Sequence, residues 1–92
     1  MADEEYLVER TVVAKAKMKG WITRKVAWQG RRGAKDHAFF GFGRCVFIEF
    51  KAVGKTLVGQ QKKEFEKLKA VYPDIHLCDN VRDGLRILGI ES

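Results

Sequence analysis

Proline, cysteine and long apolar runs are all scarce in this chain of 92 residues. Its apolar runs fall short of the ~20 residues that a membrane-spanning helix needs, so we expect no such span. Cys45 and Cys78 lie in strand-like apolar segments and share no zinc-ligand spacing with His37 or His76. We therefore expect two buried free thiols rather than a zinc site.

Acidic residues are missing from residues 10–35, a stretch that contains nine lysines and arginines. The net charge is +6, and the acids gather before this block and again from Asp36 onward. A basic block of this kind predicts a polyanionic partner, with nucleic acid as the first candidate. The alternative interpretation is a solvated basic helix face.

The length predicts a single domain over residues 1–92, with a thin core. The N-terminal sequence MADEEYLVER is acidic and lacks the basic and apolar regions of a signal peptide. We therefore expect an intracellular protein, located in the cytoplasm or, for a phage-encoded chain, in the host cytoplasm.

Hydrophobic periodicity predicts seven elements in the order α-β-β-β-α-β-α. Asn80 suits the N-cap of the last helix, and the hairpin turn is expected near residues 41–43. Helices around a hairpin-containing sheet indicate an α/β sandwich with a mixed sheet, in which the last strand follows a right-handed crossover. The expected elements are a helix over about 3–19, a strand over 20–28, a hairpin over 36–51, a helix over 57–72, a strand over 74–79 and a final helix after residue 80.

Two charged side chains interrupt the apolar strand CVFIEFK. Glu49 and Lys51 are two residues apart, so both project from the same face of a strand. Antiparallel pairing in the hairpin sets Asp36 opposite or diagonal to Ile48 and Glu49, which brings a second carboxylate to the first. Because buried charges need partners or a metal, the pattern is either a structural ion pair at a sheet edge or part of a catalytic site.

Two further polar residues fall on the apolar stripes of predicted helices. Glu5 lies three residues before Val8 at the start of the first helix. Glu9, nearer the margin of the same face, is the alternative candidate for the inward-facing acid of this helix. Gln61 lies on the inward stripe of the second helix, where a buried amide needs partners. Acids from separate elements can converge on Mg²⁺ beside a lysine, which is the chemistry that phosphodiester hydrolysis requires.

The longer pattern resembles the VRR-NUC family, the virus-type replication-repair branch of the PD-(D/E)XK nucleases. The resemblance covers about residues 5–88. It is carried by Glu5 with Val8, Val12 and Gly20, by Lys25 after GWITR, by Asp36 at the end of GRRGAKD, by the strand VFIEFKAVGK, and by Gln61 in LVGQQKKEFEKL ahead of Leu68.

The resemblance implies a Mg²⁺- or Mn²⁺-dependent DNA endonuclease with the PD-(D/E)XK, restriction-endonuclease-like core fold. Lys51 matches the catalytic lysine, and Gln61 matches a glutamine that is expected near the active site. The implied metal ligands are Asp36, Glu49, the backbone carbonyl of Phe50, and Glu5, which would reach the metal directly or through water.

One position departs from the family pattern, because Lys35 stands where the family has a proline before the aspartate. A proline there fixes the backbone but performs no chemistry, so its loss is compatible with activity. The added cation could contact DNA or weaken metal binding slightly.

Basic residues next to this site are expected to bind DNA. Arg31, Arg32 and Lys35 would line its rim and hold the phosphate backbone with little base specificity. Trp21 and Trp28 could stack on bases, but core burial is the preferred interpretation. The basic track would continue over Lys15, Lys17, Lys19, Arg24, Lys25 and Lys55.

The resemblance also bears on assembly and substrate. Stand-alone members of the family look like dimers that act on branched DNA, including four-way junctions, and a homodimer would present two active sites to two strands. Two other interpretations stay open: a non-catalytic DNA-binding module that retains the nuclease fold, and a structural domain in which Glu49 and Lys51 form only a salt bridge. The enzyme is favoured because every expected catalytic position is filled.

Overall fold

The computed structural model describes residues 4–26, 36–52, 54–55 and 57–90. The element order is α-β-β-β-α-β-α, which confirms the predicted order. The elements are α1 (Glu4–Met18), β1 (Ile22–Val26), β2 (Asp36–Gly41), β3 (Arg44–Phe50), α2 (Gly59–Val71), β4 (Ile75–Cys78) and α3 (Val81–Ile87).

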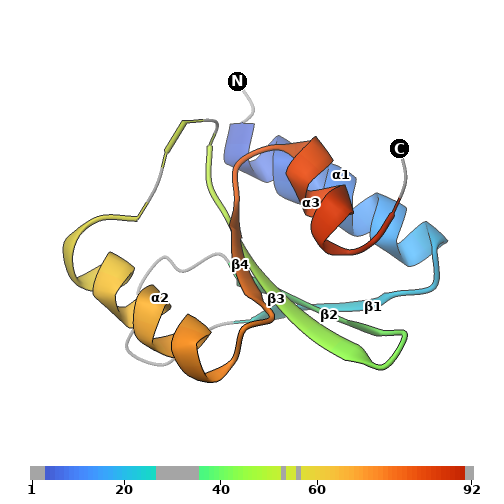
Figure 1. Ribbon diagram of the computed structural model, residues 1–92. Helices are drawn as coiled ribbons and strands as arrows, with labels where there is room; N and C mark the ends of the chain where they lie inside the picture. Colours follow the sequence, from blue (N-terminus) through green and yellow to red (C-terminus); the bar gives the residue numbers. More distant parts are fainter. Residues whose placement is uncertain (1–3, 27–35, 53, 56, 91–92) are drawn as a thin grey trace.

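The strands form one mixed sheet in the order β1-β2-β3-β4. β1 and β3 both pair with β2 in antiparallel fashion, whereas β3 and β4 are parallel. The parallel pair requires a crossover connection, which α2 provides. α1 and α3 lie together on one face of the sheet, and α2 lies on the other (Figure 1). The chain is therefore an α/β protein with a four-stranded mixed sheet flanked by helices, as the sequence predicts.

The main core lies between the sheet and α1. The predicted apolar stripe of α1 is confirmed, because Val8, Val12 and Ala16 are all buried in one cluster with Ile48 and Phe50 of β3. The side chains of alternate β3 residues therefore point toward α1, and the residues between them point to the opposite face.

A glycine brings α3 close to α1. A Cβ atom added at Gly84 would lie only 2.7 Å from the Val12 side chain and 3.3 Å from Cys78 Sγ. Asn80 caps α3 as predicted, since its side chain accepts a 2.8 Å hydrogen bond from the backbone N–H of Asp83. α3 is thus fixed at its start by a cap and along its length by close helix packing.

Several single-residue predictions can be compared with the structure. Both cysteines are free thiols, but only Cys78 is buried, and burial raises the pKa of its thiol; Cys45 is half-buried. Trp21 is buried as expected, whereas Trp28 lies outside the described residues. Among the helices described, none combines the length and the apolar character needed to cross a lipid bilayer.

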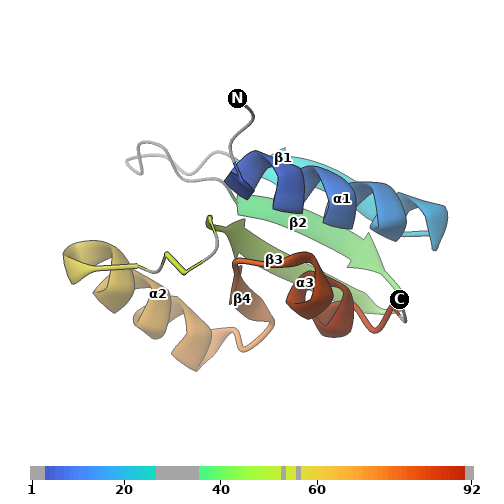
Figure 2. The ribbon, with the colours of Figure 1, turned by 90° about the horizontal axis from the view of Figure 1, so that it is seen from above.

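The predicted inward position of Gln61 is wrong. Gln61 is exposed, and none of the α2 residues is fully buried. The reason is that α2 is anchored to the sheet near its C-terminal end, where the ring of Tyr72 lies 5.9 Å from that of Phe47 and the Tyr72 hydroxyl donates to the carbonyl of Cys45. The first turns of α2 extend beyond the strands, as Figure 1 and Figure 2 both show. An apolar stripe on this helix therefore does not reach a core along its whole length.

Candidate active site

Asp36 and Glu49 are direct cross-strand partners at one end of the sheet. This register confirms the prediction that the hairpin brings the second carboxylate to the first. The side chains of Ile48 and Phe50 enter the core under α1, so strand alternation directs Glu49 and its partner Asp36 to the opposite face. Both acids are buried, with exposed fractions of 2% for Asp36 and 3% for Glu49. Two buried carboxylates therefore project side by side from neighbouring strands.

Lys51 supplies a cation to this pair. Its Nζ lies 3.2 Å from Glu49 Oε2, and its side chain is 22% exposed against 4% for Glu49. The backbone N–H of Lys51 donates a 2.8 Å hydrogen bond to the carbonyl of Cys78, which continues the pairing of β3 with β4 beyond Phe50. The extended backbone keeps Lys51 on the same face as Glu49, as the i, i+2 spacing predicts. The lysine thus stands between the buried acids and solvent.

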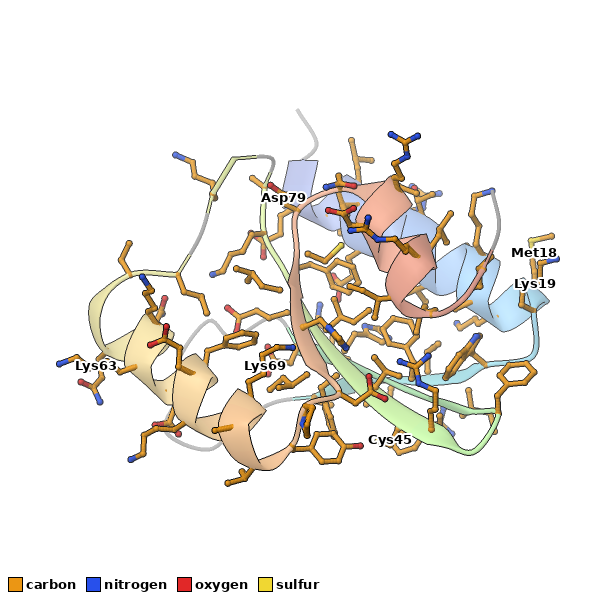
Figure 3. The ribbon with its side chains drawn as sticks, in the orientation of Figure 1. Met18, Lys19, Cys45, Lys63, Lys69 and Asp79 are labelled. Carbon is orange, nitrogen blue, oxygen red and sulfur yellow. The ribbon has the colours of Figure 1, made fainter. Side chains whose placement is uncertain are left out.

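The loop after Lys51 is tied to the end of β4. The backbone N–H of Gly54 donates a 3.0 Å hydrogen bond to Asp79 Oδ2, and Asn80 donates to the other oxygen of the same carboxylate at 2.7 Å. The hydrogen bond from Gly54 is the main cause of the lowered pKa of Asp79. Asp79, labelled in Figure 3, therefore helps to hold the loop after Lys51 against the end of β4.

Glu5 does not join a three-ligand group with Asp36 and Glu49. Among the residues that the structure describes, no cluster of three histidine, cysteine or acidic side chains is suited to a metal ion. Glu5 is half-buried in the first turn of α1, and this helix covers the face of the sheet opposite to the two acids. A contact of Glu5 with a metal through water stays a prediction, and Gln61, which is exposed on α2, likewise stays outside the buried pair.

The α1 face holds a second charged cluster, built on Glu9. Glu9 Oε2 lies 3.1 Å from His37 Nδ1, and Lys25 Nζ lies 3.1 Å from Glu9 Oε1. The Glu9 side chain is 9% exposed and that of His37 is 11% exposed, whereas Lys25 is 60% exposed. Burial raises the pKa of Glu9, but the hydrogen bonds from His37 and Lys25 outweigh it, so the pKa lies below its ordinary value.

This second cluster changes the interpretation of three residues. Glu9, considered in the sequence only as an alternative to Glu5, is buried and contacts His37 and Lys25. Lys25 forms an ion pair with that carboxylate, although most of its side chain stays accessible to a phosphate. His37 was missed by sequence reasoning; its place next to Asp36 in an alternating strand is the signal, because alternation sends neighbouring residues to opposite faces.

The remaining predicted DNA contacts are only partly described. Lys15, Lys17 and Lys19 are exposed at the end of α1, and Arg24 and Lys55 are exposed as well. These positions are compatible with phosphate contacts. Arg31, Arg32 and Lys35, which were predicted to line the rim of the site, lie outside the described residues.

The chemistry of the acid pair fits a hard divalent cation. Mg²⁺ is typically held by one or two carboxylates, with water and substrate phosphate completing its coordination, so it does not need a cage of protein ligands. Asp36 and Glu49 offer oxygen atoms only, and the backbone carbonyl of Phe50, the residue after Glu49, stays a predicted third ligand. A site of this type suits Mg²⁺ or Mn²⁺ rather than Zn²⁺, which prefers nitrogen and sulfur ligands.

Comparisons of the chain with protein-family models, with curated proteins and with solved structures give no match. The functional proposal below is therefore based on the sequence motifs and on the geometry of the acid pair.

Proposed function

We propose that this protein is a metal-dependent DNA endonuclease of the VRR-NUC type, with a PD-(D/E)XK core. The observation that carries the proposal is the direct pairing of buried Asp36 with buried Glu49, beside Lys51 at 3.2 Å. Two carboxylates held side by side on neighbouring strands offer oxygen ligands, so the arrangement suits a divalent cation. The α-β-β-β-α-β-α order and the basic charge are compatible with this class of enzyme.

The roles follow from the positions of the side chains. Asp36, Glu49 and the carbonyl of Phe50 would hold Mg²⁺ or Mn²⁺. Such an ion lowers the pKa of a water ligand and offsets charge on a phosphodiester. Lys51, at the exposed side of the acids, would leave Glu49 and donate to the phosphate oxygen on which charge develops. Glu5 would contribute through water, and Gln61, being exposed, would contact the substrate rather than buried groups.

The proposed substrate is DNA, bound mainly through phosphates. Exposed lysines and arginines over α1 and β1 supply affinity without reading bases. The preference for branched DNA such as four-way junctions, and a homodimer with two active sites, are proposals that come from the family resemblance. Sedimentation at micromolar concentration, with and without a junction, tests the dimer; a monomer under both conditions would exclude it.

Cleavage of labelled DNA tests the function directly. Four-way junction, flap, nicked and linear substrates are compared in Mg²⁺, Mn²⁺ and EDTA, using wild type, Asp36→Asn, Lys51→Ala and the control Lys63→Ala. Lys63, labelled in Figure 3, is an exposed lysine on α2 to which the proposal assigns no role. We expect metal-dependent cutting that both site variants lose by at least about a hundredfold and that the control retains.

The ion pair itself supports a second candidate, a non-catalytic DNA-binding module. Lys51 Nζ already lies 3.2 Å from Glu49 Oε2, and in the second candidate this ion pair persists without a metal ion. Thermal unfolding in Mg²⁺ separates the two candidates, because an ion that binds the folded state raises its stability. An unfolding temperature that does not change with Mg²⁺, together with DNA binding but no cutting of any substrate, would support the binding module and refute the nuclease.

A further inference from the structure

A second candidate site lies at the opposite end of the sheet from the acid pair. The C-terminal ends of α1 and α3 meet the β2–β3 hairpin there and enclose a cavity of about 560 Å³, a volume in the range of small-ligand sites. We call it the hairpin cavity. Its wall includes Lys19, Trp21, Phe42, Arg44, Leu88 and Ile90.

Phe42 has an unusual conformation at the tip of the hairpin. Phe42 and Gly43 form the turn between β2 and β3, and their φ angles are +53° and +74°. Positive φ at both turn positions is typical of a type I′ turn, where Asn-Gly is the preferred pair. A phenylalanine is strained there, and its side chain is still 70% exposed. The strain and the exposure together indicate that this ring serves a purpose other than forming the turn.

The inner wall of the cavity is rigid. The Trp21 ring meets Phe42 edge to face at 5.1 Å between centroids and is itself buried. The Arg44 guanidinium lies 6.0 Å from the Trp21 ring centroid. It is fixed there by two hydrogen bonds to Asp74, at 2.8 and 3.0 Å, and by a third to the carbonyl of Ile87 at 3.1 Å. One exposed aromatic ring thus stands against a preorganised wall of Trp21 and Arg44, whose charge Asp74 offsets.

The electrostatics of the cavity favour an anion at its rim. No acidic residue is found among the described residues that line it, and Lys19 is exposed at its edge (Figure 3). The negative end of α3 is largely offset, because the carbonyls of Leu85, Arg86 and Ile87 all accept hydrogen bonds. Two further exposed lysines, Lys15 and Lys17, precede Lys19 on α1.

We infer that the hairpin cavity takes one unpaired nucleotide of a DNA strand, with its base on Phe42 and its phosphates on Lys19 and the neighbouring α1 lysines. An aromatic platform beside a cationic track is the general way in which proteins bind single-stranded nucleic acid. The choice of DNA rests on the proposed function, whereas the choice of a nucleotide rests on the ring, the cavity and the charge.

The cavity is separate from the acid pair. Gly41 lies five positions after Asp36 along β2, which corresponds to ~16 Å at ~3.3 Å per residue. The two sites also use opposite faces of the sheet, because Trp21 packs in the core under α1. The nucleotide held in the cavity therefore belongs to a different part of the substrate from the bond that is cut, as in a branch or an unpaired extension.

Binding to extended and blunt duplexes tests the inference. A fluorescent duplex with a short thymidine extension is compared with the same duplex made blunt, in EDTA so that cleavage cannot intervene. We expect wild type to bind the extended duplex about tenfold more tightly. Phe42→Asn removes the ring but places a preferred residue in the turn, so the fold should be kept while the preference disappears. Lys19→Ala should reduce the preference, and the controls Phe40→Thr and Lys63→Ala should retain it.

Each other outcome overturns the inference. The inference fails if wild type binds the two duplexes with equal affinity, or if Phe42→Asn keeps the preference. It also fails if Phe42→Asn weakens the binding of both duplexes equally, or if free thymidine monophosphate binds as tightly as the extended duplex. Cleavage assays with Phe42→Asn keep the two proposals apart. Loss of the preference in a protein that never cuts DNA would support the cavity and refute the nuclease, whereas cutting without any preference would do the reverse.

Discussion

Two charged clusters lie on opposite faces of the sheet, one built on Glu9 and the other on Asp36 and Glu49. The two clusters differ in the residues that contact their carboxylates. On the α1 face, Glu9 is held by Lys25 from β1 and by His37 from β2, so three separate elements meet at one carboxylate. On the other face, Asp36 and Glu49 come from neighbouring strands, and the adjacent cation, Lys51, comes from the same strand segment as Glu49. The first cluster joins elements together, whereas the second concentrates negative charge.

The difference supports the proposal that the first cluster is structural and the second functional. One buried carboxylate that is held by a lysine and a histidine already has its partners within the fold. Two buried carboxylates beside Lys51 offer the oxygen ligands that a divalent cation needs. Asp36 and His37 are consecutive residues, so strand alternation alone assigns them to the two clusters. The comparison predicts opposite effects for the same chemical change at the two sites.

The largest expected effect is on activity, from Glu49→Gln. We expect cleavage to fall by at least about a hundredfold, because a neutral amide is a poor ligand for Mg²⁺. The free energy of unfolding should stay within about 1 kcal/mol of wild type or rise, because the change relieves repulsion with Asp36 and leaves a lysine that can reach solvent. Urea unfolding beside cleavage rates measures both. A variant that cuts normally would assign this cluster to structure as well.

Glu9→Gln should show the reverse behaviour. The amide cannot serve His37 and Lys25 as the carboxylate does, so we expect a loss of about 2 kcal/mol in the free energy of unfolding. Cleavage per folded molecule should stay within about threefold of wild type, since the acid pair lies on the other face. Urea unfolding provides the measurement, and Glu66→Gln, an exposed acid on α2, is the matched control. Equal stability of the two variants would contradict a structural role for Glu9.

Much of this comparison could be predicted from local patterns. The glycines around Phe42 and the alternation of β2 and β3 determine the hairpin register, and the register alone pairs Asp36 with Glu49. The i, i+2 spacing is enough to direct Lys51 to the same face. These features need only a strand period and a turn, both of which are encoded within a few residues.

Other features depend on how elements meet. The stripe of α2 predicted an inward Gln61, but periodicity does not tell how far a helix overlaps its sheet, and Gln61 lies on the part that extends beyond it. Glu5 and Glu9 lie one turn apart on α1, so the helix period cannot choose between them. The choice is made by His37 and Lys25, which lie on strands that only the tertiary fold brings to Glu9.

The smallest expected effect concerns acid stability. Folding lowers the pKa of Glu9, so the folded state favours its charged form over the unfolded chain. The stabilisation is complete above the ordinary pKa of about 4.5 and is lost as the pH falls through the lowered value. Within the described parts of the chain, the titratable groups that contact Glu9 are Lys25 from β1 and His37 from β2. Wild type should therefore lose its advantage over Glu9→Gln below about pH 4.5. Urea unfolding of both proteins between about pH 6 and about pH 3, on either side of the ordinary pKa of Glu, measures this convergence. A difference in the free energy of unfolding that stays constant with pH would show that the charge of Glu9 contributes nothing.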